Sequence, residues 1–204
     1  MSDPLDRARG ISTTEEASQL YAEWASTYDD DVFGALGFTG SARIADLLVE
    51  VLTDPAQPVV DLGCGTGAVG QRLAQLGVTT IDGIDLSPEM LTVAARTGAY
   101  RRLTVGDLND LPDAPNAMYA ASVSAGTFTT GHVGPDAVPR LMDLLRPDGV
   151  VAWVIATALW PRFEPVFATM RLDVRHQSIE SIRRDAAPEA VMFVARLSCR
   201  SVHG

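Results

Sequence analysis

Basic residues are scarce in this chain. It contains no lysine, and 16 arginines stand against 26 acidic residues in 204 positions, which gives a formal net charge of −10. A field of that sign repels phosphate backbones. The basic doublets, Arg101-Arg102 and Arg183-Arg184, are typical of solvated surface pairs. We therefore expect no nucleic-acid partner.

Cysteine and long apolar runs are scarce as well. Cys64 and Cys199 are far apart, and the longest apolar run, Val150 to Leu159, is about half of what a membrane span needs. The first four residues, Met1 to Pro4, show neither the basic nor the apolar region of a signal peptide. These absences predict a cytoplasmic protein that has no disulfides and does not bind membranes.

The length and composition fit one globular domain. A chain of 204 residues with 47% hydrophobic and 21% charged residues is long enough for a single α/β unit and short for two. We expect one domain over residues 1–204, with a mobile tail at 1–12. The domain is expected to be a monomer or a homodimer.

An aromatic N-terminal helix is predicted after the tail. Residues Thr13 to Glu16 form a capping box, and Tyr21, Trp24 and Tyr28 recur on one face of the helix that follows. Three acids, 29–31, are expected to end that helix, where the macrodipole is unfavourable to them. With glycines spaced like hinges, residues 13–40 are predicted to form a lid.

The central motif is a strand that runs into a glycine-rich turn. A short apolar strand ends at Asp61, and glycines follow at alternate positions, Gly63, Gly65 and Gly67, before a helix begins. Glycine permits backbone angles that are closed to other residues and lets ligand atoms approach the main chain. The motif therefore predicts a nucleotide site.

Two interpretations of the motif compete. Gly65-x-Gly67-x-x-Gly70 satisfies a dinucleotide fingerprint, which would indicate an NAD(P)-linked oxidoreductase. The fuller pattern, Asp61-x-Gly63-x-Gly65-x-Gly67, places an acid at the strand end and supplies no obvious group for a pyrophosphate.

Two later strands also end in acids, Asp85 and Asp107. Strands that alternate with helices predict an α/β fold, with a mostly parallel sheet, helices on both faces and ligands at the carboxyl ends of the strands. An acid in the place of Asp85 can accept hydrogen bonds from ribose hydroxyls. Beyond the first strand, further strands are expected at 79–85, 101–105, 116–124 and 150–157, with a closing antiparallel pair at 172–179 and 191–198.

These motifs together resemble the class I S-adenosylmethionine-dependent methyltransferases, over about Tyr21 to Trp153. The N-terminal aromatic pattern and Gly131-His132-Val133 are most similar to the methyltransferase-like protein of the Williams-Beuren region and its bacterial relatives. The resemblance implies a Rossmann-like fold with a seven-stranded sheet and an antiparallel edge hairpin. One departure is Ala120, since those relatives tend to carry an acid there.

The resemblance also implies a cofactor and its site. S-adenosylmethionine would lie across the strand ends, with the glycine turn at its amino-acid end, Asp85 at the ribose and Asp107-Leu108 at the adenine. The residues expected to bind it are Tyr28, Asp61, Gly63, Cys64, Gly65, Gly67, Asp85, Leu86, Met90, Gly106, Asp107, Leu108 and Ser124.

We expect the catalytic residues in the loop after the fourth strand and in the aromatic helix. His132 is the best general base, because the reference pKa of histidine suits neutral pH, and Tyr28 is placed beside it as a second catalytic residue. Local packing of His132 is the alternative. The predicted substrate pocket contains Tyr21, Trp24, Phe128 and Trp160. The three histidines are far apart and no set of metal ligands is expected.

Methyl transfer to a small organic acceptor, at O, N, S or activated C, is the predicted function. The NAD(P)-linked oxidoreductase remains an alternative, although no Tyr-x-x-x-Lys pair is present. A third possibility is a non-catalytic protein that binds S-adenosylmethionine, which Ala120 and the lack of a dedicated substrate domain favour.

Overall fold

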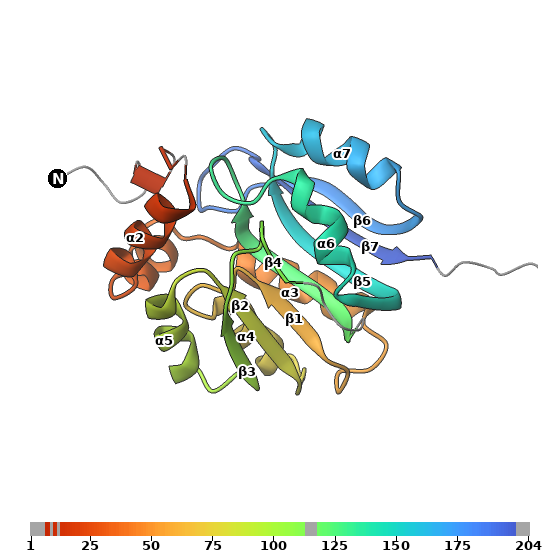
Figure 1. The fold of residues 1–204 in the computed structure, drawn as a ribbon, viewed down its shortest axis with the longest axis horizontal. Coiled ribbons are helices and arrows are strands. Elements are labelled where there is room, and N and C mark those ends of the chain that lie inside the picture. The colour runs from red at the N-terminus through yellow and green to blue at the C-terminus, as the bar shows by residue number, and fades with distance from the viewer. Residues whose placement is uncertain (1–6, 9, 12, 113–117, 199–204) are drawn as a thin grey trace, which may run out of the picture.

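A seven-stranded sheet forms the centre of the molecule (Figure 1). The computed structural model describes residues 7–198 except 9, 12 and 113–117, so most of the expected tail at 1–12 and the start of the expected strand at 116 lie outside the described residues. The strand order is β3-β2-β1-β4-β5-β7-β6. The strands are β1 (Val59–Leu62), β2 (Ile81–Asp85), β3 (Arg102–Val105), β4 (Tyr119–Phe128), β5 (Leu145–Ala156), β6 (Leu172–Glu180) and β7 (Ala190–Leu197).

The first five strands are parallel, and β7 pairs antiparallel with both β5 and β6. All four residues of β1 are buried, as expected for a parallel strand that is covered on both faces. The α/β fold with an antiparallel hairpin at one edge is therefore confirmed. Within β5, Asp148 adopts a left-handed conformation with φ of 70°, which aspartate tolerates better than most residues.

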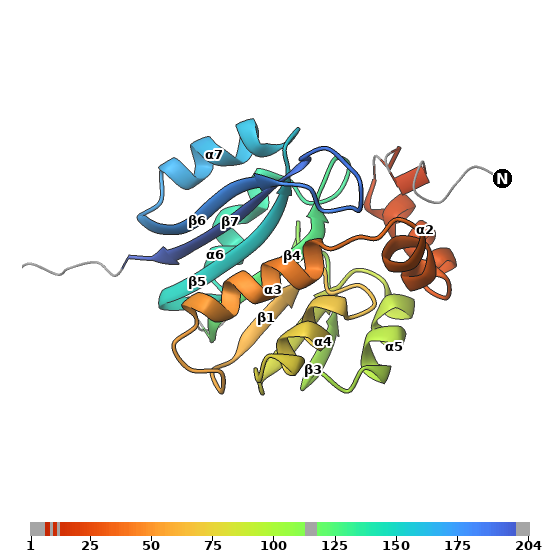
Figure 2. The ribbon, with the colours of Figure 1, turned by 180° about the vertical axis from the view of Figure 1, so that it is seen from behind.

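Helices cover both faces of the sheet (Figure 2). One apolar core lies between the sheet and α3 and α4, and another lies between the opposite face and α6 and α7. The helices are α2 (Thr14–Trp24), α3 (Gly40–Val51), α4 (Ala68–Gln75), α5 (Pro88–Arg96), α6 (Val138–Met142) and α7 (Trp160–Ala168), with a π-helical turn η1 (Asp30–Ala35) and a 3₁₀ turn η2 (Pro135–Ala137). Within the described residues, no helix is long and apolar enough to cross a membrane.

The acidic run 29–31 does not end the aromatic helix, contrary to the sequence prediction. Helix α2 begins at its predicted cap, Thr13, whose hydroxyl accepts a hydrogen bond from the Glu16 amide, but it ends at Trp24. Asp30 and Asp31 lie instead in the first turn of η1. Asp31 accepts hydrogen bonds from the indole of Trp24 at 2.7 Å and from a threonine hydroxyl. Asp31 therefore holds the turn between α2 and η1 in place.

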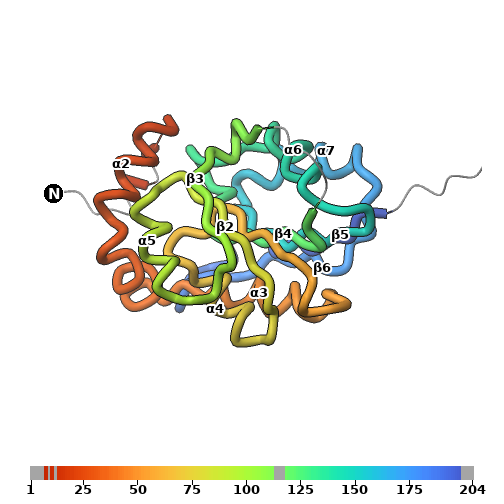
Figure 3. Tube along the Cα trace, turned by 60° about the horizontal axis from the view of Figure 1, so that its bottom comes forward, coloured from red at the N-terminus to blue at the C-terminus, as the bar shows by residue number. Residues whose placement is uncertain are grey.

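The N-terminal segment is docked across the carboxyl ends of the strands. Helix α2 lies beside α5 at one end of the molecule (Figure 3). At the other end of the segment, the Thr39 amide donates to Ile182 O at 2.8 Å, and Phe38 forms a β-bridge with Arg183. Residues 13–40 thus join the α5 side of the sheet to the connection between β6 and β7. Ile11, expected in the mobile tail, is buried.

Candidate active site

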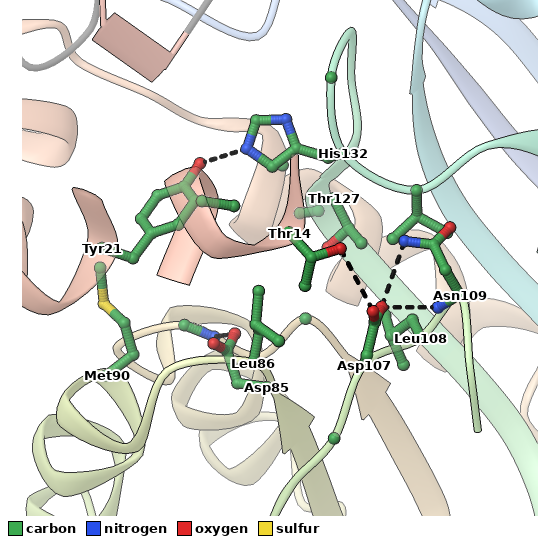
Figure 4. A pocket seen from close by; sticks show the side chains of 18 of the residues that line it. Thr14, Tyr21, Asp85, Leu86, Met90, Asp107, Leu108, Asn109, Thr127 and His132 are labelled. Carbon is green, nitrogen blue, oxygen red and sulfur yellow. Dashed lines mark hydrogen bonds between the residues drawn. The ribbon is translucent and has the colours of Figure 1, made fainter. Parts of the chain in front are cut away.

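The ends of β1, β2, β3 and β4 meet at a cavity of about 110 Å³ beneath α2 (Figure 4). We call it the first cavity. The loop that follows each parallel strand lies at the carboxyl-terminal edge of the sheet, which explains why residues distant in sequence lie close together here. Its walls are formed by Thr14, Ala17, Tyr21, Tyr28, Gly63, Gly65, Asp85, Leu86, Met90, Gly106, Asp107, Leu108, Asn109, Ala125, Gly126, Thr127, Gly131, His132 and Val133.

Asp85 is held rigidly at the cavity wall. Its Oδ2 accepts a hydrogen bond from the Gly65 amide at 2.7 Å, and its Oδ1 accepts one from the Ser87 amide at 2.9 Å. Burial raises the pKa of Asp85, and these amides partly offset that effect. The carboxylate therefore links the glycine turn after β1 to the start of α5, with its orientation fixed by backbone.

Asp107 is fixed from two sides. One carboxylate oxygen accepts from the Asn109 amide at 2.9 Å, and the other accepts from the Thr14 hydroxyl at 3.3 Å. Thr14 belongs to the first turn of α2, so this contact attaches the N-terminal helix to the end of β3. Leu86, Met90 and Leu108 supply apolar surface nearby.

The glycines of the turn serve different purposes. Gly65 has φ of +52°, and a Cβ built on it would meet no atom within 4 Å, so its backbone borders open space at the cavity. A Cβ on Gly63 would lie 2.1 Å from the Thr127 hydroxyl oxygen. Gly65 therefore lets a ligand approach the main chain, whereas Gly63 allows β1 and β4 to come together.

Gly67 and Gly70 make room for Tyr100. A Cβ on Gly70 would lie 2.3 Å from Cζ of that ring, and one on Gly67 would lie 3.0 Å from Cε2. The Tyr100 hydroxyl accepts a hydrogen bond from the Gly70 amide at 3.2 Å and donates one to Asp61 Oδ2 at 2.7 Å. The third glycine of the apparent dinucleotide fingerprint thus packs against a tyrosine. No sequence pattern pointed to Tyr100.

Asp61 lies beneath the turn and does not line the first cavity. It is fully buried, and its Oδ1 has no hydrogen-bond partner among the described residues. Burial raises the pKa of Asp61 to about 7, although the hydrogen bond from Tyr100 opposes this. A buried carboxylate with one unpaired oxygen is costly unless a cation or donor joins it.

Three other predicted cofactor residues also lie away from the wall of the first cavity. Ser124 is buried and donates its hydroxyl proton to Leu62 O at 2.7 Å, because its side chain turns into the sheet. Gly67 packs against Tyr100, as described above. Cys64 is buried, and burial raises the pKa of its thiol. The remaining predicted cofactor residues line the first cavity: Tyr28, Gly63, Gly65, Asp85, Leu86, Met90, Gly106, Asp107 and Leu108.

A second cavity, of about 450 Å³, adjoins the first. The two share a wall made of Tyr21, Tyr28, Gly63, Gly65, Ala125, Gly126 and His132. Beyond this wall the second cavity reaches the aromatic side chains of the N-terminal segment and the connection from Ile182 to Ala190. The sequence did not identify this connection, since nothing in its composition shows which end of the sheet it covers.

His132 and Tyr21 form a hydrogen-bonded pair in the shared wall, visible in Figure 4. The Tyr21 hydroxyl lies 2.8 Å from His132 Nε2. On the other side of the ring, Nδ1 lies 3.1 Å from Thr130 O and 3.0 Å from the Thr129 hydroxyl. Burial lowers the pKa of His132, so the imidazole is neutral at pH 7.

Two residues predicted for the substrate pocket lie elsewhere. Phe128 is fully buried against Trp153 and Phe163, because its position on β4 points toward α7. Trp160 packs on Phe193 from the first turn of α7. Both belong to the core on the α6 and α7 face, whereas Tyr21 and Trp24 line the second cavity. In the described part of the chain, no group of three or more His, Cys, Asp or Glu side chains could hold a metal ion.

Comparison with known proteins identifies relatives of the chain. Residues 59–149 match a family model described as a methyltransferase domain. Human methyltransferase-like protein 27 is 31% identical over 153 residues, covering 74% of this chain and 62% of that protein. The trans-aconitate 2-methyltransferase of Mycobacterium tuberculosis is 32% identical over 160 residues, covering 78% of this chain and 58% of the relative. The chain thus spans about three fifths of the length of these relatives.

Solved structures share the fold at low sequence identity. The cyclase SpnF matches with a TM-score of 0.72 at 15% identity, covering 93% of this chain and 97% of that one. A TehB-like S-adenosylmethionine-dependent methyltransferase from Corynebacterium glutamicum matches with a TM-score of 0.60 at 21% identity, covering 89% and 96%. At these identities the likeness concerns the fold alone.

Proposed function

We propose that the chain is a class I S-adenosylmethionine-dependent methyltransferase, which transfers the methyl group of this cofactor to a small organic acceptor and releases S-adenosylhomocysteine. The observation that carries the proposal is the pair of adjoining cavities with a shared wall. One cavity has the groups that a nucleoside requires, and the other provides space for an acceptor.

The donors and acceptors of the first cavity fit the cofactor. Asp85 would accept hydrogen bonds from the ribose hydroxyls, and Asp107 would accept one from the adenine amino group. The open space above Gly65 would take the amino-acid end, and its ammonium group would compensate the charge of Asp61, whose Oδ1 has no partner among the described residues. When bound, the cofactor supplies an electrophilic methyl group on a positively charged sulfur.

The chain's own residues contribute positioning, exclusion of water and a place for a proton. Positioning alone can supply on the order of 7 to 11 kcal/mol of the barrier. Tyr21, which belongs to α2, and Tyr28 border both cavities. An acceptor that arrives protonated needs a base, which is typically worth about 10²- to 10⁴-fold in rate. His132 is the neutral base in reach.

The second cavity does not favour a carboxylic acid such as the trans-aconitate named for the mycobacterial relatives. Arg183 and Glu189 are the charged residues among its described lining, and they form an ion pair with each other. A carboxylate acceptor would therefore have no unpaired cation at this cavity.

We propose a small molecule as the acceptor and the cytoplasm as the location of the protein. The net charge of −10 supports the absence of a nucleic-acid partner.

Turnover with a panel of acceptors tests the proposal. Phenols, thiols, amines and carboxylic acids are each incubated with the protein and S-adenosylmethionine, and S-adenosylhomocysteine release is measured. We expect reproducible release with at least one class and none without an acceptor. Cofactor binding without turnover of any class would instead support a non-catalytic binding protein.

A further inference from the structure

The second cavity has a continuous aromatic wall. Tyr21 and Trp24 stack with ring centroids 6.3 Å apart and planes 12° apart, and Trp24 meets Tyr28 edge-on at 4.8 Å. The series continues from Tyr28 to Phe33 at 6.2 Å and from Phe33 to Phe38 at 6.1 Å. All five rings line the cavity. Such a wall favours a planar aromatic ligand, because rings pair with one another through offset stacks and edge contacts.

Charge at the second cavity is internally balanced. Arg183 Nε donates to Glu189 Oε1 at 2.6 Å, and its terminal amino group also bonds Glu189. These are the charged side chains that the described lining of this cavity contains. A charged acceptor would be desolvated there without a partner, which is costly. The cavity therefore matches an acceptor without a net charge.

The tautomer of His132 follows from its neighbours. The Thr130 carbonyl can only accept, so Nδ1 carries the proton and donates to it at 3.1 Å. Nε2 is then the unprotonated nitrogen, and it accepts a hydrogen bond from the Tyr21 hydroxyl at 2.8 Å. The basic nitrogen of His132 is thus already occupied by Tyr21. An acceptor in the cavity would meet the oxygen of Tyr21 before it could reach Nε2.

We propose, resting on the methyl transfer proposed above, that the acceptor is an uncharged aromatic hydroxyl compound and that Tyr21 and His132 together relay its proton. The acceptor oxygen forms the new bond to the methyl carbon while the bond from sulfur to that carbon breaks, and its electron pair remains on sulfur as the neutral thioether. The acceptor O–H proton passes to the Tyr21 oxygen, and the Tyr21 proton passes to His132 Nε2. Tyr21 is regenerated and His132 ends as an imidazolium.

The surroundings keep both members of the pair in the required states. Burial lowers the pKa of His132, so it is an unprotonated base at neutral pH. Burial, followed by Tyr28 and Asp85, raises the pKa of Tyr21, so it keeps its proton until His132 accepts it. Besides His132, Tyr28 and Asp85 are the titratable groups that act on Tyr21. Burial and the Thr130 carbonyl act on His132.

Binding of matched probes tests the acceptor class. The protein saturated with S-adenosylhomocysteine is titrated calorimetrically with naphthol, with naphthoate, which has the same rings and a carboxylate, and with trans-aconitate. We expect naphthol to bind at least about tenfold more tightly than either acid. Glu189→Gln, which leaves Arg183 unpaired, should raise naphthoate affinity and leave naphthol affinity nearly unchanged.

The outcomes separate the two proposals. Failure of S-adenosylhomocysteine to bind would overturn the methyltransferase function itself. Normal binding of that product together with equal or tighter binding of naphthoate or trans-aconitate, or no binding of naphthol, would overturn the acceptor class alone.

The pH dependence of naphthol methylation tests the relay. The wild-type rate should fall as the pH drops and His132 becomes protonated, with a midpoint below the usual 6.5 of histidine. Tyr21→Phe keeps the ring but removes the hydroxyl, so kcat at neutral pH should fall by about 100-fold. Its rate should rise only at higher pH, as naphthol itself ionises, so its midpoint should lie well above that of the wild type.

A matched variant and an independent readout complete the test. Tyr28→Phe removes a hydroxyl from the same wall but not the one bound to His132, and it should retain the wild-type midpoint. Naphthol affinity of Tyr21→Phe, measured calorimetrically, should stay within about threefold of wild type. A Tyr21→Phe variant with the wild-type pH profile would show that the relay is wrong.

Discussion

Replacing Asp61 with asparagine is expected to stabilise the ligand-free protein above neutral pH. Asp61 is fully buried, with Tyr100 on one oxygen and no described partner for the other. Its folded pKa of about 7 lies above the unfolded 3.8, so the folded state binds more protons between these values. Stability is therefore lost as the pH rises through this window, and the full penalty applies above about pH 7.

The size of this stability penalty follows from the difference between the folded and unfolded pKa values of Asp61. At about 1.4 kcal/mol per pKa unit, the ionised Asp61 costs the folded state about 4 kcal/mol above pH 7. Asparagine removes the charge but leaves an unpaired amide where Oδ1 lies, which costs ~1 to 3 kcal/mol. The net gain is about 2 kcal/mol near pH 8, or a Tm rise of about 4 to 8 °C for a chain of this size.

Thermal unfolding of the ligand-free protein at two pH values is the assay. The gain for Asp61→Asn should vanish near pH 5, where wild-type Asp61 is mostly protonated. Asp82→Asn is the matched control, since Asp82 is also buried on the neighbouring strand β2 but accepts hydrogen bonds from Arg101 and Tyr119. Burial raises the pKa of Asp82, and these bonds outweigh it, so the control should lower Tm near pH 8.

The same substitution should weaken cofactor binding, because an ammonium group near Oδ1 loses its counter-charge. We expect S-adenosylmethionine affinity to fall at least about tenfold in Asp61→Asn. A Tm gain that is equal at both pH values, or a loss near pH 8, would refute the assignment of Asp61 as an uncompensated buried carboxylate.

Further predictions concern the cavity wall and the N-terminal segment. Asp85→Ala should lower S-adenosylhomocysteine affinity at least about tenfold, as measured by calorimetry, because charge-assisted hydrogen bonds contribute ~1.5 to 3 kcal/mol each. Normal affinity in a folded variant would remove Asp85 from the site. Gly65→Ala should abolish that binding, whereas Gly98→Ala, which shares a positive φ and open surroundings but lies outside the cavity, should keep it. Amide exchange over residues 13–40 should slow when S-adenosylhomocysteine binds, and equal protection in both states would make the segment a permanent part of the core.

The sheet and the strand-end acids could be predicted because they depend on local patterns. Alternation of apolar strands with helices indicated the parallel sheet, and the capping residue Thr13 begins its helix as expected. Asp85 and Asp107 reached the first cavity because parallel strands place their carboxyl ends at one edge. These features need no knowledge of distant contacts.

Features that depend on contacts between distant segments could not be predicted in this way. Asp61 was assigned to the ligand without its partner Tyr100, which holds one of its oxygens through a contact between the first strand and the approach of the third. The connection from Ile182 to Ala190 lines the second cavity only because Phe38 pairs with Arg183. Phe128 and Trp160 were assigned to the pocket from their positions after strands, whereas their side chains point into the core.

Ligand choice by the first cavity is the most direct test of the account. Calorimetric titration of the protein with S-adenosylhomocysteine and, separately, with NADH measures it under one set of conditions. The carboxylate acceptors Asp85 and Asp107 and the Tyr100 ring packed under Gly70 predict micromolar or tighter binding of S-adenosylhomocysteine and no detectable binding of NADH. Binding of NADH with no binding of S-adenosylhomocysteine would contradict it.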